Sequence, residues 1–526
     1  MSDTARPASI FNDVLGPVMT GPSSSHTAGP TRIGKAVREL VGEDILRATI
    51  AFKEDGAYPA TYKGQRTDMG FVGGLLGFGP EDEQLIDALN IAPERGRDYR
   101  FTSEPLDHPH PNAARITATG VSGRTQTFLT VSTGGGMFEI CEIDGHPVCI
   151  RGDFYEMTAQ CPDPSRQEEL QAQAEAIGAR LTATDGPDGL FIHLSSEAPF
   201  SPSLLKLAGA MDTEGECRVS LMDRILPVGG RFQYDMPFMD ASGAQKVARS
   251  EGLDAAELAI RYETAASGAS RDEIMERMKE IIRFMRASAE TGLRGGLPKT
   301  GYMDPVAADM AVNAQQTRLA DLGVMNRGML IATAVMECNS TGGIVVAAPT
   351  AGSCGTLPAA VLSVAESMGL SADKQAEAML AAGLVGVFIA HQATFAAETC
   401  ACQAEIGSST AMAAAAVSQL LGGSTEQSFA AAGLALQNVM GLICDPIGGL
   451  VELPCVNRNS MAASNAVVSA NMVLCGFDPV IPLDEVIIAM RETGKLLPSE
   501  LRCTTRGGLC ITPTSLAIQD KLNRPA

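Results

Sequence analysis

The chain has 526 residues, a formal net charge of −21, 45% hydrophobic residues and 19% charged residues. Its length exceeds the size at which one hydrophobic core stops growing, so we expect two or more domains. The hydrophobic content argues against disorder, and the acidic balance argues against binding to nucleic acid or to an anionic membrane surface.

The start of the chain carries acidic residues and lacks the apolar core of a signal peptide, and no apolar stretch is long enough to span a bilayer. The 13 cysteines lack the dense, even spacing of a secreted disulfide framework. We therefore expect a cytoplasmic protein with reduced cysteines that are available as metal ligands.

Near the N-terminus, GPSSSHTAGPTRIGKA places five polar side chains in succession before an expected helix: Ser23, Ser24, Ser25, His26 and Thr27. Their hydroxyl and imidazole groups can donate several hydrogen bonds to an anion, so this run is a candidate site for a substrate carboxylate. The alternative is ordinary helix capping by Ser or Thr.

Residues 48–148 contain short β-rich runs such as RATIAF, RITATG and TFLTVS, separated by Gly and Pro, with a helix predicted over 68–77. Residues 154–223 are predicted as strand, helix, strand, helix and strand in that order. This pattern suggests a small α/β sandwich over about 138–232 that resembles an ACT-like regulatory module.

The pattern changes at about residue 240. The segment DEIMERMKEIIRFMRASAE has the apolar spacing of an amphipathic helix, and later segments such as QAEAMLAAGLVGVFIAHQA are apolar on nearly all sides. The C-terminal half is therefore predicted to be an all-α domain.

Three cysteines in this half are flanked by glycine, proline or polar residues: Cys402 in CQAEIG, Cys444 in CDPIGGL and Cys455 in LPCVNRN. Thiolates select zinc, copper(I) or iron–sulfur clusters, and these separations do not fit the C-x2–4-C pairs of structural zinc. Three thiolates without a fourth partner suggest a metal centre with an open coordination position for substrate. The alternative is three buried free thiols.

Several long blocks resemble the iron–sulfur L-serine dehydratases. APTAGSCGTLPA, CQAEIGSSTAMAAA and GLICDPIGGLVELPCVNRN are similar to the α domain of that family, and GPSSSHTAGPTRIGKA, HPNAARITA and STGGG are similar to its β domain. The resemblance implies an α+β protein in which an N-terminal α/β region precedes a large all-α domain. The expected domains are a β-like domain over 1–137, the ACT-like segment over 138–232 and the all-α catalytic domain over 233–526.

The resemblance further implies that Cys402, Cys444 and Cys455 hold a [4Fe–4S] cluster whose fourth iron is open to substrate. The expected reaction dehydrates L-serine to pyruvate and ammonia without pyridoxal phosphate, in a homodimer. Some relatives place a C-terminal cysteine tail in the active site as a fourth ligand. This chain continues well past Cys503 and Cys510, which argues against that tail mechanism and leaves open whether either thiol approaches the cluster.

One segment departs from the family pattern. Where a Gly-His-Gly-Thr-Asp segment is expected, the chain has Lys63-Gly64-Gln65-Arg66-Thr67-Asp68, so the expected histidine is replaced by Gln65, which cannot act as a base. We take His26, Lys63 and Asp68 as the candidate catalytic residues.

Arg66 is a candidate substrate-binding residue because a guanidinium can grip a carboxylate bidentately, although a solvated surface arginine is an equal alternative. A second polar wall is predicted at Ser340 and Thr341, with helix capping again the alternative. Arg66 opens a second functional hypothesis, a dehydratase of another β-hydroxy acid such as a 3-hydroxyaspartate. A hypothesis of another class is a non-catalytic amino-acid or redox sensor.

Overall fold

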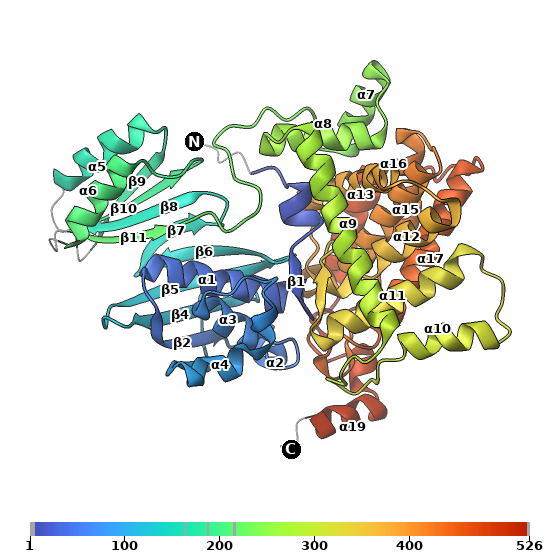
Figure 1. Cartoon of the computed structure of the whole chain (residues 1–526), viewed down its shortest axis with the longest axis horizontal. Helices are drawn as coiled ribbons and strands as arrows, with labels where there is room; N and C mark the ends of the chain where they lie inside the picture. The colour runs from blue at the N-terminus through green and yellow to red at the C-terminus, as the bar shows by residue number, and fades with distance from the viewer. Residues whose placement is uncertain (1–5, 162–164, 187–188, 214–216, 523–526) are drawn as a thin grey trace.

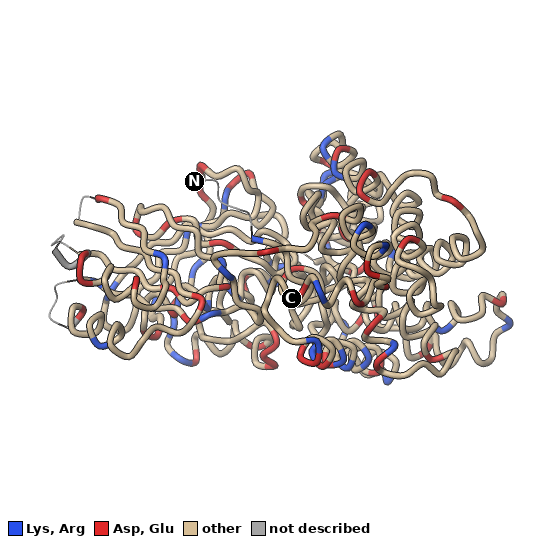
Figure 2. The backbone as a smooth tube through the Cα atoms, turned by 90° about the horizontal axis from the view of Figure 1, so that it is seen from above, with Lys and Arg blue, Asp and Glu red and all other residues tan. Residues whose placement is uncertain are grey.

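In the computed structural model, which describes residues 6–161, 165–186, 189–213 and 217–522, an α/β part and a helical part lie side by side (Figure 1). This arrangement confirms the predicted fold class. Acidic and basic residues are interspersed along the whole chain, so the net charge does not belong to one region (Figure 2). None of the described helices combines the length and apolarity needed to cross a bilayer.

A six-stranded sheet forms the body of the α/β part, in the order β3-β2-β4-β5-β6-β7. Its strands are β2 (Ile45–Lys53), β3 (Asp98–Glu104), β4 (Ala113–Gly120), β5 (Thr125–Gly134), β6 (Met137–Ile143) and β7 (His146–Ile150). Only β2 and β3 pair in parallel. Ala114, Ile116 and Ala118 alternate along β4 and are buried, as expected for a sheet with one face packed against helices.

The helices of this part are α1 (Gly29–Val41), α2 (Tyr58–Thr61), α3 (Thr67–Leu76) and α4 (Ala88–Glu94). The predicted helix over 68–77 is confirmed as α3. Helices α1 and α3 pack backbone to backbone: a Cβ atom on Gly74 would lie 2.1 Å from the carbonyl oxygen of Thr31. Glycine is needed there because any side chain would push the two helices apart.

The predicted small sandwich forms a second sheet, in the order β11-β8-β10-β9, with two helices on one face. Its elements are β8 (Tyr155–Cys161), α5 (Ser165–Ala176), β9 (Arg180–Gly186), β10 (Gly189–Ser196), α6 (Pro202–Thr213) and β11 (Arg218–Met222). Every predicted element is present, but the prediction missed β9. This edge strand, RLTATDG, turns only Leu181 and Ala183 towards the core of the sandwich, so its sequence lacks a strong apolar signal.

A disulfide joins Cys161 of β8 to Cys217, beside β11. All cysteines were expected to be reduced, and this pair is the exception. The other 11 cysteines, which include Cys402, Cys444 and Cys455, form no disulfide within the described residues.

The C-terminal part is a packed array of helices, as predicted. They are α7 (Ala241–Glu251), α8 (Ala255–Ser267), α9 (Arg271–Arg294), α10 (Ala307–Gln316), α11 (Val324–Thr341), α12 (Thr356–Met368), α13 (Ala372–Gln392), α14 (Ala397–Cys400), α15 (Ser408–Leu420), α16 (Thr425–Gln437), α17 (Cys455–Leu474), α18 (Leu483–Leu496) and α19 (Pro513–Leu522). Most of α13 and nearly all of α15 are buried, which fits their Ala-rich sequences. Single-turn helices lie at Ile10–Val14, Ser24–Ala28, Glu83–Asp87, Ala351–Ser353, Gln403–Gly407, Ile447–Gly449, Ser499–Leu501 and Gly508–Ile511.

The first described residues pack against the helical part before the chain enters the α/β part. Ile10 and Val14 pack so closely on α13 that Cβ atoms on Gly383 and Gly386 would lie 2.6 and 2.1 Å from their side chains. Strand β1 (Val18–Thr20) then pairs antiparallel with β12 (Ile344–Val346) of the helical part. The first residues of the expected β-like domain therefore pack and pair with elements of the all-α domain.

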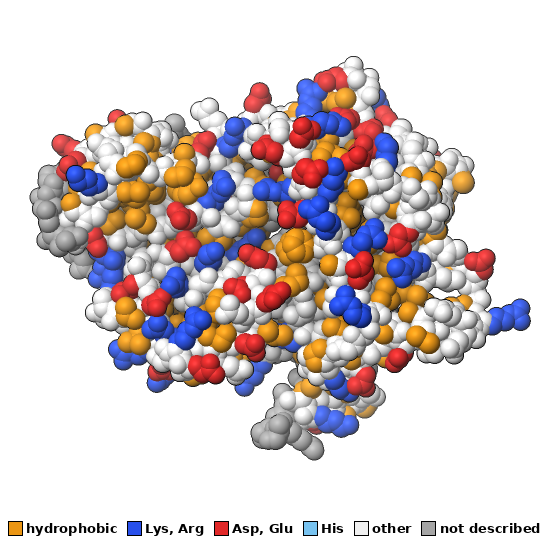
Figure 3. Space-filling model, in the orientation of Figure 1, with side chains coloured by type: hydrophobic (Ala, Val, Ile, Leu, Met, Phe, Trp, Pro, Cys, Tyr) orange, Lys and Arg blue, Asp and Glu red, His pale blue; other side chains and the backbone are white. Residues whose placement is uncertain are grey.

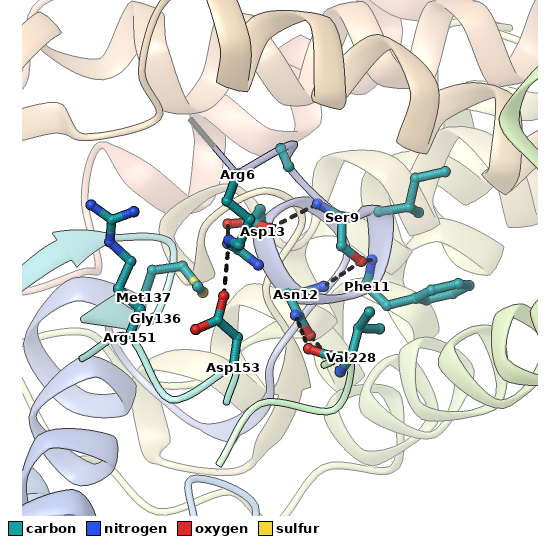
Figure 4. Close-up of polar contacts among 12 residues, drawn as sticks. Arg6, Ser9, Phe11, Asn12, Asp13, Gly136, Met137, Arg151, Asp153 and Val228 are labelled. Atoms are coloured by element: carbon teal, nitrogen blue, oxygen red, sulfur yellow. Dashed lines mark hydrogen bonds and ion pairs between the residues drawn. The ribbon is translucent and has the colours of Figure 1, made fainter. Parts of the chain in front are cut away.

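The same N-terminal turn holds both ends of the stem that carries the small sandwich (Figure 4). Arg6 pairs with Asp13 at 2.7 Å and approaches Asp153, just before β8, at 3.5 Å. The Asn12 amide donates to the carbonyl oxygen of Val228, after β11, and accepts from its N–H, at 2.7 and 2.9 Å. The N-terminal turn thus connects all three parts of the molecule.

Candidate active site and cysteine centre

Cys402 and Cys444 are brought together by the residue after Cys402. The backbone N–H of Gln403 donates to the carbonyl oxygen of Leu442 at 2.9 Å, and its side-chain oxygen accepts from the N–H of Gly441 at 2.8 Å. Both cysteines are buried, at 2% and 4% exposure. One ligand atom each from Cys402, Cys444 and Glu405 lie within 4.8 Å of one another, so these three residues can hold a metal.

Cys455 is the first residue of α17 and is half-buried. The next turn of this helix anchors the SCGTLP loop, because the Asn459 side chain accepts from the Gly355 N–H at 3.0 Å and donates to the Gly352 carbonyl oxygen at 2.9 Å. Cys354, in that loop, has its sulfur 3.7 Å from the Met336 sulfur and is buried in the helical core, which fits a structural thiol.

A fourth thiol, Cys503, lies beside the centre. Its backbone N–H donates to the carbonyl oxygen of Cys444 at 3.2 Å, while the Cys444 N–H donates to Leu501 at 2.9 Å. Cys503 is 8% exposed, belongs to the same apolar cluster as Cys402 and Cys444, and has a left-handed backbone with φ of 59°. The Cys510 thiol instead donates to the carbonyl oxygen of Pro446 at 3.1 Å. Cys503 is therefore the later cysteine that approaches the predicted trio.

Two charged residues shape the electrostatics of the sulfur atoms. A hydrogen bond from Cys444, together with the positive charge of Arg458, holds the pKa of the Cys402 thiol below its ordinary value. Arg458 lies on α17 and is fixed by Asp445 at 2.9 Å. Burial and the nearby Cys402 sulfur raise the pKa of Glu405 well above its ordinary value. The surroundings of the sulfur atoms therefore shift the pKa of Cys402 and that of Glu405 in opposite directions.

The predicted Ser23–His26 run reaches across to the helical part, where it meets Glu398 of α14. The Ser25 hydroxyl donates to Glu398 Oε1 at 2.9 Å, and the Asn112 amide donates to the same oxygen at 3.3 Å. His26 Nδ1 lies 2.9 Å from Ser25 Oγ and 3.4 Å from Glu398 Oε1. Ser23 Oγ accepts from the His26 N–H at 3.1 Å. A histidine, a carboxylate and two hydroxyls thus form one network.

The surroundings of His26 favour the neutral form of its imidazole. Its side chain is 1% exposed, and burial lowers its pKa, with the Glu398 carboxylate acting in the opposite direction. Burial alone would raise the pKa of Glu398, but His26 and the surrounding hydrogen bonds hold it below its ordinary value. His26 Nε2 is buried and has no hydrogen-bond partner among the described residues. With Nδ1 directed at Glu398, Nε2 is the nitrogen that can accept a proton.

Aromatic and hydroxyl groups enclose this network. Tyr58 meets the His26 ring edge to face at 5.1 Å, and burial raises the pKa of its hydroxyl far above the ordinary value. The hydroxyl groups of Ser132 and Tyr58 donate to the carbonyl oxygen of Ser25 at 2.8 and 3.5 Å. Hydrogen bonds from Ser132 of the sheet and from Tyr58 of α2 therefore hold the loop backbone at Ser25.

Several predicted substrate-binding hydroxyls are occupied by backbone groups. Thr27 donates to the carbonyl oxygen of Gln65 at 2.9 Å, and Thr341 donates to that of Glu337 at 2.8 Å. Ser340 donates to the same Glu337 oxygen at 3.2 Å, and Ser24 accepts weakly from the Ala351 N–H at 3.4 Å. Ser340 and Thr341 thus bond within their own helix, α11, whereas Thr27 and Ser24 bond to backbone groups that are distant in the chain.

Lys63, Arg66 and Asp68 do not join the His26 network through any contact among the described residues. Lys63, Arg66 and Ser340 line a separate cavity of about 490 Å³, next to the loop that precedes Cys455. Arg66 Nη2 donates to the Thr341 carbonyl oxygen at 3.3 Å, whereas its Nη1 is buried without a partner in the described structure. Burial raises the pKa of Asp68, whose carboxylate accepts from the Met69 N–H at 2.8 Å.

A further cavity, of about 640 Å³, leads towards the sulfur atoms. It is lined by Glu398 and Cys503 and by the basic residues Arg502 and Arg506, and it shares the segment Pro59–Ala60 with the Arg66 cavity. A small molecule in this cavity can contact Glu398 and Cys503 together. The two cavities therefore adjoin at one short segment, and only the larger one is lined by Glu398 and Cys503.

Sequence reasoning missed Glu398, Glu405 and Asn112 as members of the site. Glu405 lies within the CQAEIG block and Asn112 within the HPN block, so both could have been found in motifs that were already recognised. Glu398 had only its position four residues before Cys402 as a signal.

Comparison with known proteins agrees with this arrangement. The family described as serine dehydratase alpha chain matches residues 250–510, and that described as serine dehydratase beta chain matches residues 11–141. Residues 142–249, which contain the small sandwich, lie between the two matches.

Full-length relatives match both parts. The chain is 30% identical to the L-serine dehydratase of Streptomyces coelicolor and 31% identical to the L-serine dehydratase TdcG of Escherichia coli, in each case over 93% of this chain and 96% of the relative. The probable L-serine dehydratase alpha chain of Bacillus subtilis is 34% identical over 53% of this chain and 92% of that protein. The protein belongs to the serine dehydratase family, with the beta-chain and alpha-chain domains in one polypeptide.

Proposed function

We propose that this protein is an iron–sulfur L-serine dehydratase that converts L-serine to pyruvate and ammonia. The observation that carries the proposal is the contact between two segments that are far apart in the chain, the Ser23–His26 loop and Glu398 of α14. The enclosed His26–Glu398 network lies beside the cavity that Glu398 shares with Cys503, next to the buried sulfurs of Cys402 and Cys444.

We propose Cys402, Cys444 and Cys455 as ligands of a [4Fe–4S] cluster, and the donor set fits this group. The Cys402 and Cys444 sulfurs lie in one apolar cluster, Cys455 packs against the helical core, and the Arg458 guanidinium can balance part of the negative charge of an anionic cluster. When bound, the cluster would supply a Lewis-acidic iron that assists departure of the substrate hydroxyl.

The residues of the chain supply the proton transfer. His26 Nε2 takes the proton from Cα of serine, and Glu398 stabilises the imidazolium that forms. The Cα–H electron pair becomes the Cα–Cβ double bond as the β-hydroxyl leaves. The enamine then gains a proton to become an imine, which water hydrolyses to pyruvate and ammonia. His26 thereby takes the role that Gln65 cannot fill.

The Ser23 hydroxyl lies on the same loop as His26 and can donate to the substrate carboxylate next to the base, whereas the Ser25 hydroxyl already donates to Glu398. Burial of this loop excludes water, which strengthens each hydrogen bond to a bound anion. We further propose that the protein is a homodimer, on the family resemblance alone, and that it is cytoplasmic, on the sequence features described above. We also propose that the ACT-like segment over 138–232 is a separate domain.

A second candidate substrate is a β-hydroxy acid with an additional carboxylate, such as a 3-hydroxyaspartate. The buried and unpartnered Nη1 of Arg66 favours this substrate, since a second carboxylate would give it a partner. Lys63 lines the same cavity and adds positive charge, while Asp68 lies close enough to affect the Arg66 pKa.

The test is a substrate panel on protein purified without oxygen. We expect a brown protein that contains iron and sulfide, turns over L-serine to pyruvate and loses activity in air. L-threonine and 3-hydroxyaspartate complete the panel and separate the two substrates. A colourless protein with full activity in air would disprove the cluster, and amino-acid binding without any turnover would favour the sensor hypothesis.

A further inference from the structure

A cavity of about 360 Å³ lies where the three parts of the molecule meet, and none of the proposed catalytic or cysteine residues lines it. Its walls come from the N-terminal segment before and within β1, from α1, from the stem of the small sandwich and from α9. Its volume lies within the range of small-molecule binding sites.

Charged residues of both signs line this cavity: Arg32, Lys35 and Arg277 are basic, and Glu81 and Glu280 are acidic. In the described part of the chain, none of the five forms an ion pair within 4.0 Å. Arg277 lies over the Phe11 ring at 5.4 Å, and Glu81 acts on Arg32 from beyond ion-pair distance. The cavity therefore combines positive and negative groups that the described residues do not join in ion pairs.

Arg32 is the clearest of the five. It is 3% exposed, and its guanidinium donates to the carbonyl oxygen of Gly136 at 2.8 Å and contacts the Met137 sulfur at 3.8 Å. The Glu81 and Asp13 carboxylates act on Arg32 from a distance, but neither forms an ion pair with it. Burying an arginine without a paired carboxylate is unfavourable unless something else balances its charge. A ligand carboxylate in the cavity would provide that balance.

The remaining wall is largely apolar. Leu15, Pro17 and Val18 of the N-terminal segment face Ile281 and Phe284 of α9 across the cavity. Figure 3 shows hydrophobic side chains gathered between the two halves at the centre of this face, bordered by charged side chains of both signs. Such a wall accommodates an aliphatic or aromatic group rather than a polar one.

We propose that this cavity binds a free amino acid with an apolar side chain. The basic residues Arg32, Lys35 and Arg277 would hold the α-carboxylate, and Glu81 and Glu280 would hold the α-ammonium. The apolar wall would contact the side chain of the amino acid. A simple anion would leave the two glutamates without a role, and a simple cation would leave Arg32 without one. A zwitterion with an apolar body uses all three features.

The cavity is connected to the active site by the chain itself. Its wall includes Gly16–Val18, which lead through β1 to the Ser23–His26 loop. The other end of this segment, Asn12, holds the sandwich stem at Val228. A bound amino acid would therefore contact the segment that carries the catalytic loop.

Isothermal titration calorimetry on the full-length protein tests the proposal with L-leucine and L-phenylalanine as probes. Two analogues of leucine each lack one charge: 4-methylpentanoate has no ammonium and 3-methylbutylamine has no carboxylate. We expect both amino acids to bind and both analogues to bind roughly tenfold or more weakly, because each loses a charged hydrogen bond. L-Serine, which lacks the apolar group, should bind weakly.

Lys35→Met and Glu280→Gln provide matched variants, since neither side chain is buried and neither change should prevent folding. Each is expected to weaken L-leucine binding roughly tenfold. Lys246→Met on α7 and Glu290→Gln on α9 change exposed residues outside the cavity and should leave binding unchanged. Binding should also persist in His26→Ala, because this site does not depend on the proposed reaction.

Three results would overturn the proposal. The first is the absence of binding by either apolar amino acid at millimolar concentration. The second is binding that neither Lys35→Met nor Glu280→Gln weakens, which would locate the ligand elsewhere. The third is serine binding as tightly as leucine, which would refute the apolar specificity.

Discussion

The Ser23–His26 loop and the Lys63–Asp68 turn belong to the same α/β part, and both were predicted to carry catalytic residues. The loop is buried and tied through side chains to Glu398 of the helical part. The turn faces an open cavity and reaches the helical part through Arg66 and the Thr341 backbone. The difference teaches that two segments of one domain that both carry candidate catalytic residues can lie in different surroundings. Enclosure suits proton transfer, whereas an open cavity suits selection of the substrate.

The largest effect is expected at the sulfur atoms, on which both tasks depend. Cys444→Ser should abolish iron binding and turnover, because serine is a poor ligand for an iron–sulfur cluster. Cys400→Ser is the matched control: this thiol is buried two residues from Cys402, but it faces the carbonyl oxygen of Arg491 at 4.0 Å. Iron analysis and pyruvate formation measure the outcome, and full iron content in Cys444→Ser would remove it from the ligand set.

His26→Ala tests the role of the enclosed loop. We expect kcat for L-serine to fall by about 10²–10⁴-fold while iron content is kept, since removing a general base affects the proton transfer and not the ligands. Exchange of the serine α-proton with deuterated solvent should fall in parallel. Gln65→Ala is the control, and unchanged exchange in His26→Ala would rule out His26 as the base.

Glu398→Gln sharpens the same point with a smaller change. We expect a loss of roughly 10- to 100-fold, the usual cost of removing a partner that orients a functional histidine. Burial lowers the pKa of His26 and Glu398 opposes this, so activity of the unmodified protein should fall only below pH 6.5 as the base becomes protonated. Without the carboxylate that favours the charged form, the pKa drops further and the acidic limb of the pH profile moves to lower pH. A shift to higher pH would contradict the assignment.

The parts of the site that lie in contiguous motifs were easier to predict than those formed by contacts between distant residues. The cysteine blocks and SSSHT are contiguous motifs, so the sequence alone was enough to propose the trio as ligands and the loop as a substrate site. Glu398 escaped because its role depends on a contact with Ser25, 373 residues away in the chain. The approach of Cys503 depends on a hydrogen bond from its backbone N–H to the carbonyl oxygen of Cys444, which no local pattern encodes.

The fold shows a similar limit. Helices with strong amphipathic or all-apolar patterns and the strands of the large sheet were predictable from periodicity. The edge strand β9 was missed because it buries only two small or medium side chains, Leu181 and Ala183. The crossing of the N-terminal segment into the helical part rests on Gly383 and Gly386, whose lack of side chains becomes meaningful only once Ile10 and Val14 are placed against them.

Arg66→Met tests the open turn. If Arg66 selects a second carboxylate, turnover of 3-hydroxyaspartate should fall roughly tenfold or more, since one charged hydrogen bond is lost, while turnover of L-serine should change by less than about threefold. Arg47→Met, an exposed arginine on β2, is the control. Equal effects on the two substrates would mean that Arg66 supports the fold at Thr341 and does not select the substrate.

The smallest effect is expected from Cys503→Ser, although this thiol lies beside Cys444. Three cysteines are proposed as ligands, and the backbone hydrogen bond that joins Cys503 to Cys444 does not depend on the thiol, so iron content should be unchanged and kcat should change by less than about threefold. Cys510→Ser, whose thiol faces Pro446, is the matched control. Electron paramagnetic resonance of the reduced protein gives a readout apart from turnover, because a change in the iron ligands alters the spectrum. Loss of iron in Cys503→Ser alone would make the centre a four-cysteine site, and the position open to substrate would then have to be created by displacing Cys503.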